Sequence, residues 1–158
     1  MTTYFYGRCS ADENFEKGSS IATQIERANA YAVIHNLKID KEISESISGS
    51  IRFANRPLGL ELMNDLKRDD HIICSALDRF SRNTLDLLQL IEKFKKMKIN
   101  LHFAEFGNVT SSSAMGSVFV KLLSVFAEFY SKQCSEKQSA TKQRMIKENR
   151  FTGGKKKF

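Results

Sequence analysis

The chain has 158 residues, of which 41% are hydrophobic and 27% charged, and this suits one soluble globular domain with a full core. No stretch approaches the run of about 18 apolar residues that a membrane span needs, and the N-terminus lacks a signal-peptide pattern. Three cysteines without paired or metal-like spacing predict a reduced, cytoplasmic setting in which Cys9 and Cys74 are small core residues. These features exclude membrane proteins and disulfide-stapled secreted scaffolds.

The formal net charge of +7 lies entirely at the C-terminal end of the chain. Nine of the 25 lysines and arginines fall within residues 132–158, whose only acids are Glu136 and Glu148. A basic segment on a neutral body indicates a polyanionic partner, most often nucleic acid. A solubilising tail is the alternative.

The first predicted element is a strand over residues 2–9. Strand alternation places Tyr6, Arg8 and Ser10 on one face. Taken alone, this polar face favours a strand end wetted by solvent over a nucleophilic serine. The rest of the chain decides between the two.

A helix is predicted over residues 19–36, with Ser19 or Ser20 as its N-cap. The residues that set its apolar spacing are Ile21, Ile25, Ala28, Ala32 and Val33. A short strand near residues 37–43 and a polar loop over 44–55 follow. Pro57 then begins a helix over 57–67, in which leucines recur every four residues.

The apolar run "HIICSAL", residues 71–77, is typical of a buried parallel strand. Asn83 caps a predicted helix over 84–97, with Asp86 placed as in a capping box. One more strand is expected over 99–106. Strands that alternate with helices predict an α/β fold with a mostly parallel sheet flanked by helices.

From Ser113 onward the pattern changes to one long predicted helix of about 35 residues, or ~50 Å. Its first half carries a broad apolar stripe, and its second half is too polar to dock on a core. We therefore expect residues 1–112 to form the α/β domain and residues 113–149 to dimerise and then reach a partner. Residues 150–158 read as the start of a linker.

The stretch "ALDRFSRN" places Asp78, Arg79 and Arg82 directly after a predicted strand. Ligands of α/β sheets bind at the carboxyl ends of strands, so these residues would converge with Arg8 and Ser10 if the two strands are neighbours. Arg56 could join them from its loop. Asp78 would orient an arginine, although an ordinary ion pair is the competing interpretation.

Guanidinium groups fork onto phosphate oxygens, so this set suits a phosphoryl centre rather than an acyl one. The three histidines show no triad spacing, and there is no nucleophile elbow, no P-loop and no histidine–carboxylate cluster. We therefore expect neither a metal nor a cofactor.

These motifs together resemble the catalytic domain of serine recombinases, the resolvase–invertase superfamily. The resemblance spans about residues 3–150. It includes Tyr6-x-Arg8-x-Ser10, Gln24, "SGSIRFANRPLGLELM" with Arg56, "LDRFSRN" and "AMGSVFVKLLSVFAEF". It implies that Tyr6, Arg8, Gln24, Arg56, Asp78, Arg79 and Arg82 form a site around a nucleophilic Ser10.

The resemblance also implies a reaction and partners. Ser10 would attack the scissile phosphate of double-stranded DNA, form a covalent 5′-phosphoserine, exchange strands by subunit rotation in a tetramer, and religate. The long helix would form a homodimer and cross the minor groove, and the basic residues expected to neutralise phosphates are Lys137, Lys142, Arg144 and Lys147. Relatives continue after the linker into a further DNA-binding domain.

One departure concerns the long helix. Tyr130 and Ser131 stand where many relatives carry an acid–arginine pair, which removes one expected backbone contact. Two other classes remain open: a non-catalytic DNA-binding or regulatory module with the same fold, and a small α/β phosphoryl-transfer enzyme with a soluble substrate. Intact arginines around Ser10 disfavour the first, and the basic helix disfavours the second.

Overall fold

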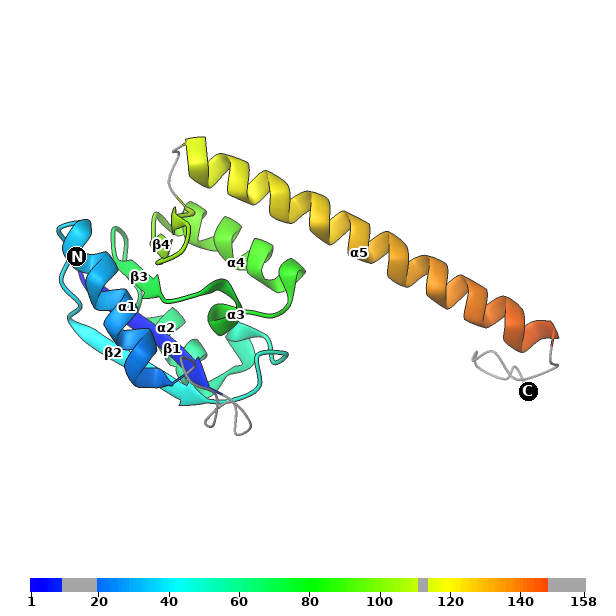
Figure 1. Ribbon diagram of the computed structural model, residues 1–158, viewed down its shortest axis with the longest axis horizontal. Helices are drawn as coiled ribbons and strands as arrows, with labels where there is room; N and C mark the ends of the chain where they lie inside the picture. The colour runs from blue at the N-terminus through cyan, green and yellow to red at the C-terminus, as the bar shows by residue number, and fades with distance from the viewer. Residues whose placement is uncertain (10–19, 111–113, 148–158) are drawn as a thin grey trace.

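The computed structural model describes residues 1–9, 20–110 and 114–147, with only part of the side chains in the last range. It contains one sheet of five strands in the order β2-β1-β3-β4-β5 (Figure 1). The strands are β1 (Thr3–Cys9), β2 (Lys41–Ser46), β3 (His71–Cys74), β4 (Asn100–Phe103) and β5 (Gly107–Asn108). The helices are α1 (Ile21–Ile34), η2 (Phe53–Asn55), α2 (Pro57–Asp65), α3 (Leu77–Phe80), α4 (Thr84–Met97) and α5 (Ala114–Lys147).

The sheet confirms the predicted α/β class. β1 pairs in parallel with both β2 and β3, and β3 pairs in parallel with β4. The short strand β5 adds an antiparallel edge that the sequence did not indicate. Because β1 lies between β2 and β3, the chain reverses its direction of travel across the sheet at β1, and the carboxyl ends of β1 and β3 meet there.

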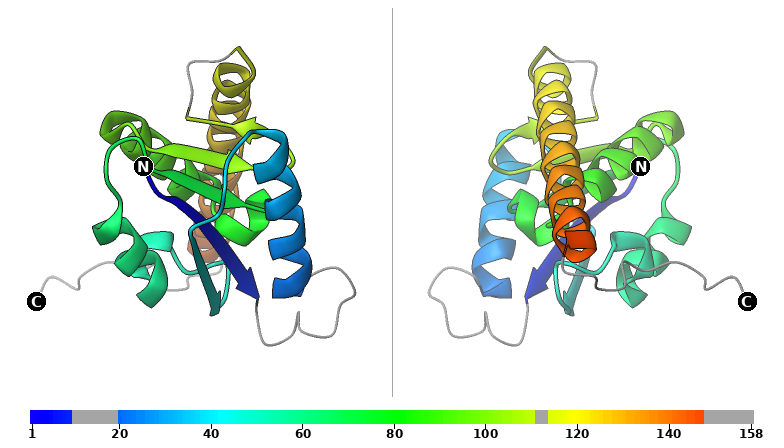
Figure 2. Two further views of the ribbon diagram at one scale, coloured as in Figure 1. Left: turned by 90° about the vertical axis from the view of Figure 1, so that its left-hand side faces the viewer. Right: turned by 90° about the vertical axis from the view of Figure 1, so that its right-hand side faces the viewer.

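Two hydrophobic clusters cover the two faces of the sheet. The larger lies against α2, α3 and α4, and Phe119, Val120 and Leu123 of α5 pack on it. The smaller lies under α1, and the two end views show α1 opposite α2 and α4 across the sheet (Figure 2). At the centre of the larger cluster, Phe80 stacks on Phe53 with ring centroids 4.4 Å apart. Each such buried ring stabilises the fold by roughly 2–3 kcal/mol.

Local signals set several helix ends as predicted. Ser20 caps α1 by accepting a hydrogen bond from the Thr23 backbone N–H at 3.2 Å, and Pro57 opens α2. Asn83 caps α4 by accepting from the Asp86 N–H at 3.0 Å. Asp86 does not complete a reciprocal capping box, because its carboxylate accepts instead from the Phe53 N–H of η2 at 3.1 Å.

The structure corrects two predictions for the first half of the chain. Val33 was expected on the buried stripe of α1 but is 75% exposed, since it follows the buried Ala32 by one residue and so points ~100° away from it. The second strand lies at Lys41–Ser46 and thus runs into the predicted loop. At the half-buried position 45 this strand carries a glutamate. The inward positions of the strand are therefore not all apolar, and the sequence pattern predicts a polar loop there.

The helix α5 leaves the body beside α4 and extends past it (Figure 1). Several of its apolar side chains are more than half exposed, namely Val118, Leu122, Val125, Phe126 and Phe129. Across the described residues, no helix is long and apolar enough to cross a lipid bilayer.

Candidate active site

The predicted site residues gather at the carboxyl ends of β1 and β3. Arg8 lies near the end of β1, and α3, which carries Asp78 and Arg79, begins three residues after β3. Arg82 follows two residues after α3, and its backbone N–H donates to the Gly49 carbonyl at 3.3 Å. The strands that carry these segments are neighbours, as the predicted convergence required. Ser10 follows β1 in sequence and lies outside the described residues.

Arg8 is fully buried, and two separate contacts fix its place. Its guanidinium Nη1 donates to the Ile47 carbonyl at 2.7 Å. Its backbone is held by the side chain of Gln24, whose Nε2 donates to the Arg8 carbonyl at 3.0 Å while the Arg8 N–H donates to Oε1 at 3.2 Å. The ladder between β1 and β3 covers Thr3–Phe5, so Gln24 takes the place of a strand partner further along β1.

Tyr6 and Arg56 form a buried relay that ends on a carboxylate. The Tyr6 hydroxyl donates to Glu45 Oε1 and accepts from Arg56 Nη1 at 2.9 Å. Both Tyr6 and Arg56 are fully buried. Burial, and then the hydrogen bond to Glu45, raise the pKa of the Tyr6 phenol well above its ordinary value of 10.0. Tyr6 is therefore a neutral donor that links the two charged groups.

A loop between β2 and η2 joins this relay to Arg8. Its backbone carbonyls point at guanidinium groups: that of Ile51 accepts from Arg56 Nε at 3.0 Å and that of Gly49 accepts from Arg56 Nη2 at 3.4 Å. Since Ile47 holds Arg8, carbonyls at three alternate positions, 47, 49 and 51, hold two buried arginines in one orientation. Arg56 is thus held by two backbone carbonyls of this loop and by the Tyr6 hydroxyl.

Asp78 and Arg79 form an ion pair, with Oδ2 and Nη2 3.4 Å apart. The Arg79 side chain is 15% exposed and that of Asp78 is 49% exposed, so the guanidinium is the more enclosed partner. The Asp78 carbonyl also lies 3.5 Å from Arg8 Nη2, which joins α3 to β1. Both interpretations of Asp78, as an orienting group and as an ordinary ion pair, are compatible with this contact.

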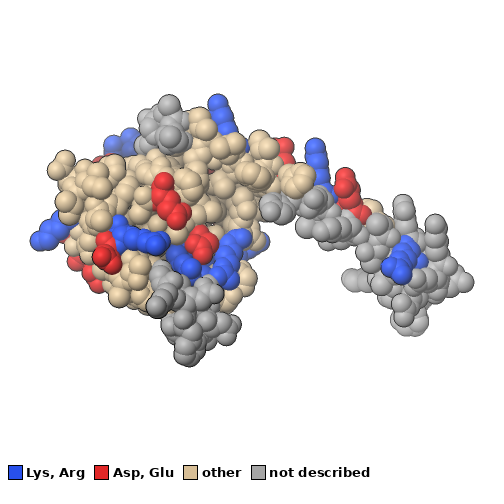
Figure 3. Space-filling model, in the orientation of Figure 1, with Lys and Arg blue, Asp and Glu red and all other residues tan. Residues whose placement is uncertain are grey.

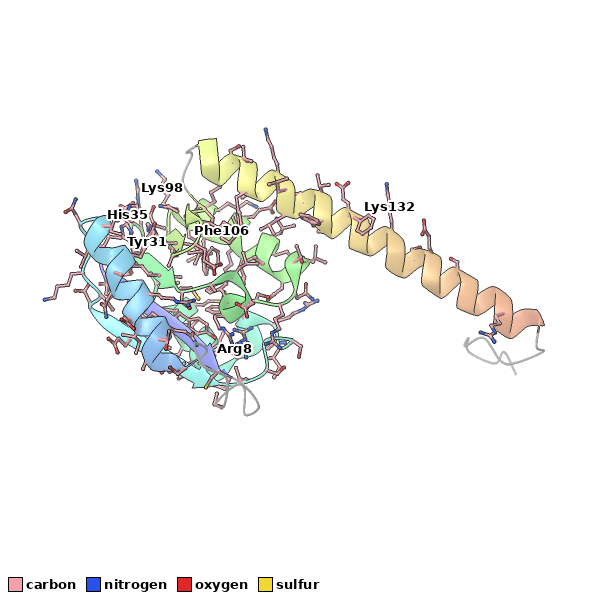
Figure 4. The ribbon with its side chains drawn as sticks, in the orientation of Figure 1. Arg8, Tyr31, His35, Lys98, Phe106 and Lys132 are labelled. Atoms are coloured by element: carbon pink, nitrogen blue, oxygen red, sulfur yellow. The ribbon has the colours of Figure 1, made fainter. Side chains whose placement is uncertain are left out.

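A strand end wetted by solvent does not describe this region. Tyr6, Arg8 and Arg56 have no exposed surface, and a buried arginine is costly unless its donors are satisfied. Figure 4 shows Arg8 inside the body near the end of β1, and Figure 3 shows basic side chains, with acidic ones between them, on the lower part of the body. Backbone carbonyls of the loop between β2 and η2 supply acceptors for both buried guanidinium groups.

Sequence reasoning did not single out Glu45 and Gly49, which both contact the arginine network. The signal for Glu45 was present, because Ile43, Glu45 and Ile47 alternate and so place its carboxylate on an inward face. Gly49 carried no comparable signal, since its role depends on which side chains the fold brings against it.

Two of the four predicted DNA contacts, Lys142 and Arg144, are exposed on α5. The side chains of Lys137 and Lys147, like those of Tyr130 and Ser131, lie outside the described set. No group of three or more potential metal ligands occurs among the described His, Cys, Asp and Glu residues. Cys74 is buried, and burial raises the pKa of its thiol to about 12.

A second polar cluster lies on the other face of the sheet, under α1. The Tyr31 hydroxyl is 3.0 Å from His102 Nδ1, and His102 Nε2 is 2.8 Å from His71 Nδ1. The His35 ring packs on Tyr31 with centroids 4.2 Å apart (Figure 4). Tyr31 and His35 of this histidine cluster lie well away from Arg8 in Figure 4.

The chain matches a known protein family and several curated relatives. The family model described as "Resolvase, N terminal domain" matches residues 3–151. The Transposon Tn2501 resolvase of Escherichia coli is 30% identical over 107 residues, covering 68% of this chain and 55% of the relative. The Transposon Tn917 resolvase of Enterococcus faecalis is 30% identical over 78% of this chain and 59% of its own length. The chain thus spans little more than half of these curated relatives.

Two solved structures have a similar fold. The N-terminal catalytic domain of TP901-1 integrase aligns with a TM-score of 0.69 and 30% identity, covering 84% of this chain and 98% of that one. A resolvase family site-specific recombinase from Streptococcus pneumoniae aligns with a TM-score of 0.68 over 93% of this chain and 99% of that one, at 23% identity. The second likeness concerns the fold alone.

Proposed function

Since the chain belongs to the resolvase family and is a serine recombinase catalytic domain, we propose that it cuts and rejoins DNA strands through a covalent phosphoserine at Ser10. The observation that carries this proposal is the convergence of Arg8, Arg79 and Arg82 at the carboxyl ends of β1 and β3. Ser10 directly follows β1 in sequence, two residues after Arg8.

The proposed step is a phosphoryl transfer. The Ser10 oxygen forms a bond to the scissile phosphorus while the bond from phosphorus to the 3′ oxygen breaks. The proton lost by the serine hydroxyl ends on the departing 3′ oxygen, and the 5′ side stays on the enzyme. Religation runs the same exchange in reverse, so the phosphodiester bond is re-formed without an external energy source. Charge develops on the phosphoryl oxygens in between, and permanently charged guanidinium groups placed beforehand stabilise it.

The remaining residues of the site have supporting roles in this proposal. Gln24 fixes the backbone of Arg8, and Asp78 pairs with Arg79. Tyr6 and Arg56 act behind the site, because they bond to each other and Arg56 holds the loop that contacts Arg8. They are positioning residues.

We assign pairing of subunits and contact with DNA to residues 113–149. The exposed apolar side chains of α5 at 118, 122, 125, 126 and 129 recur at helical spacing on one side of the helix. An apolar patch of that kind marks an interface, and a second copy of the chain is the proposed occupant. Dimers would assemble into a tetramer for strand exchange, with Lys142 and Arg144 on the DNA backbone.

The test is a denaturing gel of the protein incubated with a nicked or suicide DNA substrate. Wild type should form a covalent protein–DNA adduct, Ser10→Ala should form none, and EDTA should leave the wild-type adduct intact. Adduct in the serine variant would refute the assigned nucleophile. DNA binding by wild type without any adduct would favour the non-catalytic module, and neither binding nor adduct would favour an enzyme for a small substrate.

A further inference from the structure

Gly49 is the common contact of three arginines of the candidate site. Its carbonyl accepts from Arg56 Nη2 at 3.4 Å and from the backbone N–H of Arg82 at 3.3 Å. On its other side, a Cβ added to Gly49 would meet the Arg82 side chain and the Arg8 guanidinium.

The distances explain why this residue is a glycine. A Cβ would lie 2.9 Å from both Cγ and Cδ of Arg82 and 3.1 Å from Nη2 of Arg8. Carbon atoms pack at about 3.5–4.0 Å, so a Cβ would force the Arg82 stem to shift and would press tightly on Nη2 of Arg8. The backbone gives no separate reason, because Gly107 is the described glycine with a left-handed φ and Gly49 is not. Glycine at this position is therefore what allows both arginine side chains to approach as closely as they do.

We propose that Gly49 is a positioning residue that sets the separation between Arg8 and Arg82 for strand cleavage. This inference rests on the proposed function, and it adds to that proposal a residue with no reactive side chain. The missing Cβ lets a buried guanidinium and an adjacent arginine stem approach the same point from two elements. Their charges can then act on one phosphate.

An alanine at this position would displace one arginine more than the other. Arg8 is fully buried and bound to the Ile47 carbonyl at 2.7 Å, so it has little freedom to move. Arg82 is exposed, and its stem can shift by the roughly half an ångström that normal contact needs. This shift of Arg82 would lower the stability of the fold only slightly. It would lower the rate of cleavage much more, since misplacement of a charged group by about 1 Å can cost 10²-fold in rate.

The test compares wild type, Gly49→Ala and Gly49→Val as full chains, with Gly107→Ala as the matched control. Single-turnover adduct formation at saturating DNA gives the rate, a DNA titration gives Kd, and thermal unfolding gives Tm. We expect Gly49→Ala to lower the rate about 10-fold or more and valine to lower it further. Its Tm should fall by no more than about 3 °C, and its Kd should stay within about 3-fold.

The control separates strain from positioning. Gly107 has a φ of +80°, so alanine there should lower Tm by about 3–6 °C without changing the rate of the folded protein. A Gly49→Ala rate equal to wild type, or a loss that follows Tm or Kd, would overturn the inference. Absence of adduct in wild type would instead overturn the proposed function. A crystal structure of Gly49→Ala then decides, because Arg82 left in place beside Arg8 would refute the inference without any activity measurement.

Discussion

The histidine cluster makes the stability of this protein depend on pH, and His102 is the group to change. His102 is 5% exposed, and its two ring nitrogens contact Tyr31 of α1 and His71 of β3. Burial, followed by the nearby His71 and His35, lowers its pKa from 6.5 to about 3. Burial also lowers the pKa of His71, against the opposing effect of Asp70 and Asp69.

The direction in which stability changes with pH depends on the protonation of His102 in the folded and unfolded chains. In the unfolded chain His102 takes up a proton near pH 6.5, whereas in the folded protein it stays neutral down to about pH 3. The stability is therefore fully present above pH 6.5 and is lost as the pH falls toward 3. At about 1.4 kcal/mol for each pKa unit, the complete window corresponds to roughly 4–5 kcal/mol.

Urea unfolding of wild type and His102→Gln at pH 7, 6, 5 and 4 measures this loss directly. Between pH 6 and 4, the free energy of unfolding of wild type minus that of His102→Gln should fall by about 1.4 kcal/mol for each pH unit of acidification. A difference between wild type and His102→Gln that is constant with pH would show that His102 is not held neutral.

Three further outcomes can be checked with simple variants. Asn83→Ala should lower the free energy of unfolding by about 1 kcal/mol, because the Asp86 N–H at the start of α4 loses its cap; an unchanged urea midpoint would contradict this. Gly59→Ala should cost more, about 1–3 kcal/mol, since its Cβ would lie 2.4 Å from the Phe53 carbonyl oxygen, and thermal unfolding measures it. Arg79→Lys should slow adduct formation much more than it weakens DNA binding, because lysine cannot reproduce the guanidinium fork; equal losses would mean that Arg79 only positions DNA.

The basic half of α5 gives one more test. Removing residues 132–158 should flatten the salt dependence of DNA binding, because fewer counterions are released on binding. Titration against a short duplex at several salt concentrations would show it, and unchanged affinity would identify the segment as a solubilising tail.

Several features of this protein were determined by the sequence by itself. Ser20, Pro57 and Asn83 mark helix starts because a cap acts on backbone groups within about four residues, so no distant contact is needed. The alternation of strands with helices also predicted the parallel sheet, because two parallel strands need a crossover connection and a helix supplies it. The site could be predicted as a set because parallel strands end at one edge, whatever the details of their packing.

The tertiary structure alone decided what each of these residues contacts. The sequence placed Arg56 in the predicted site, and packing buries its guanidinium against Tyr6 and the carbonyls of Ile51 and Gly49. The alternation around Glu45 indicates an inward face but not its partner, because Tyr6 lies 39 positions away. Gly49 has no local mark, since Arg8 and Arg82 are distant from it in the chain. Propensity and periodicity describe neighbours along the chain, whereas the separation of two guanidinium groups is set by how closely two backbones approach.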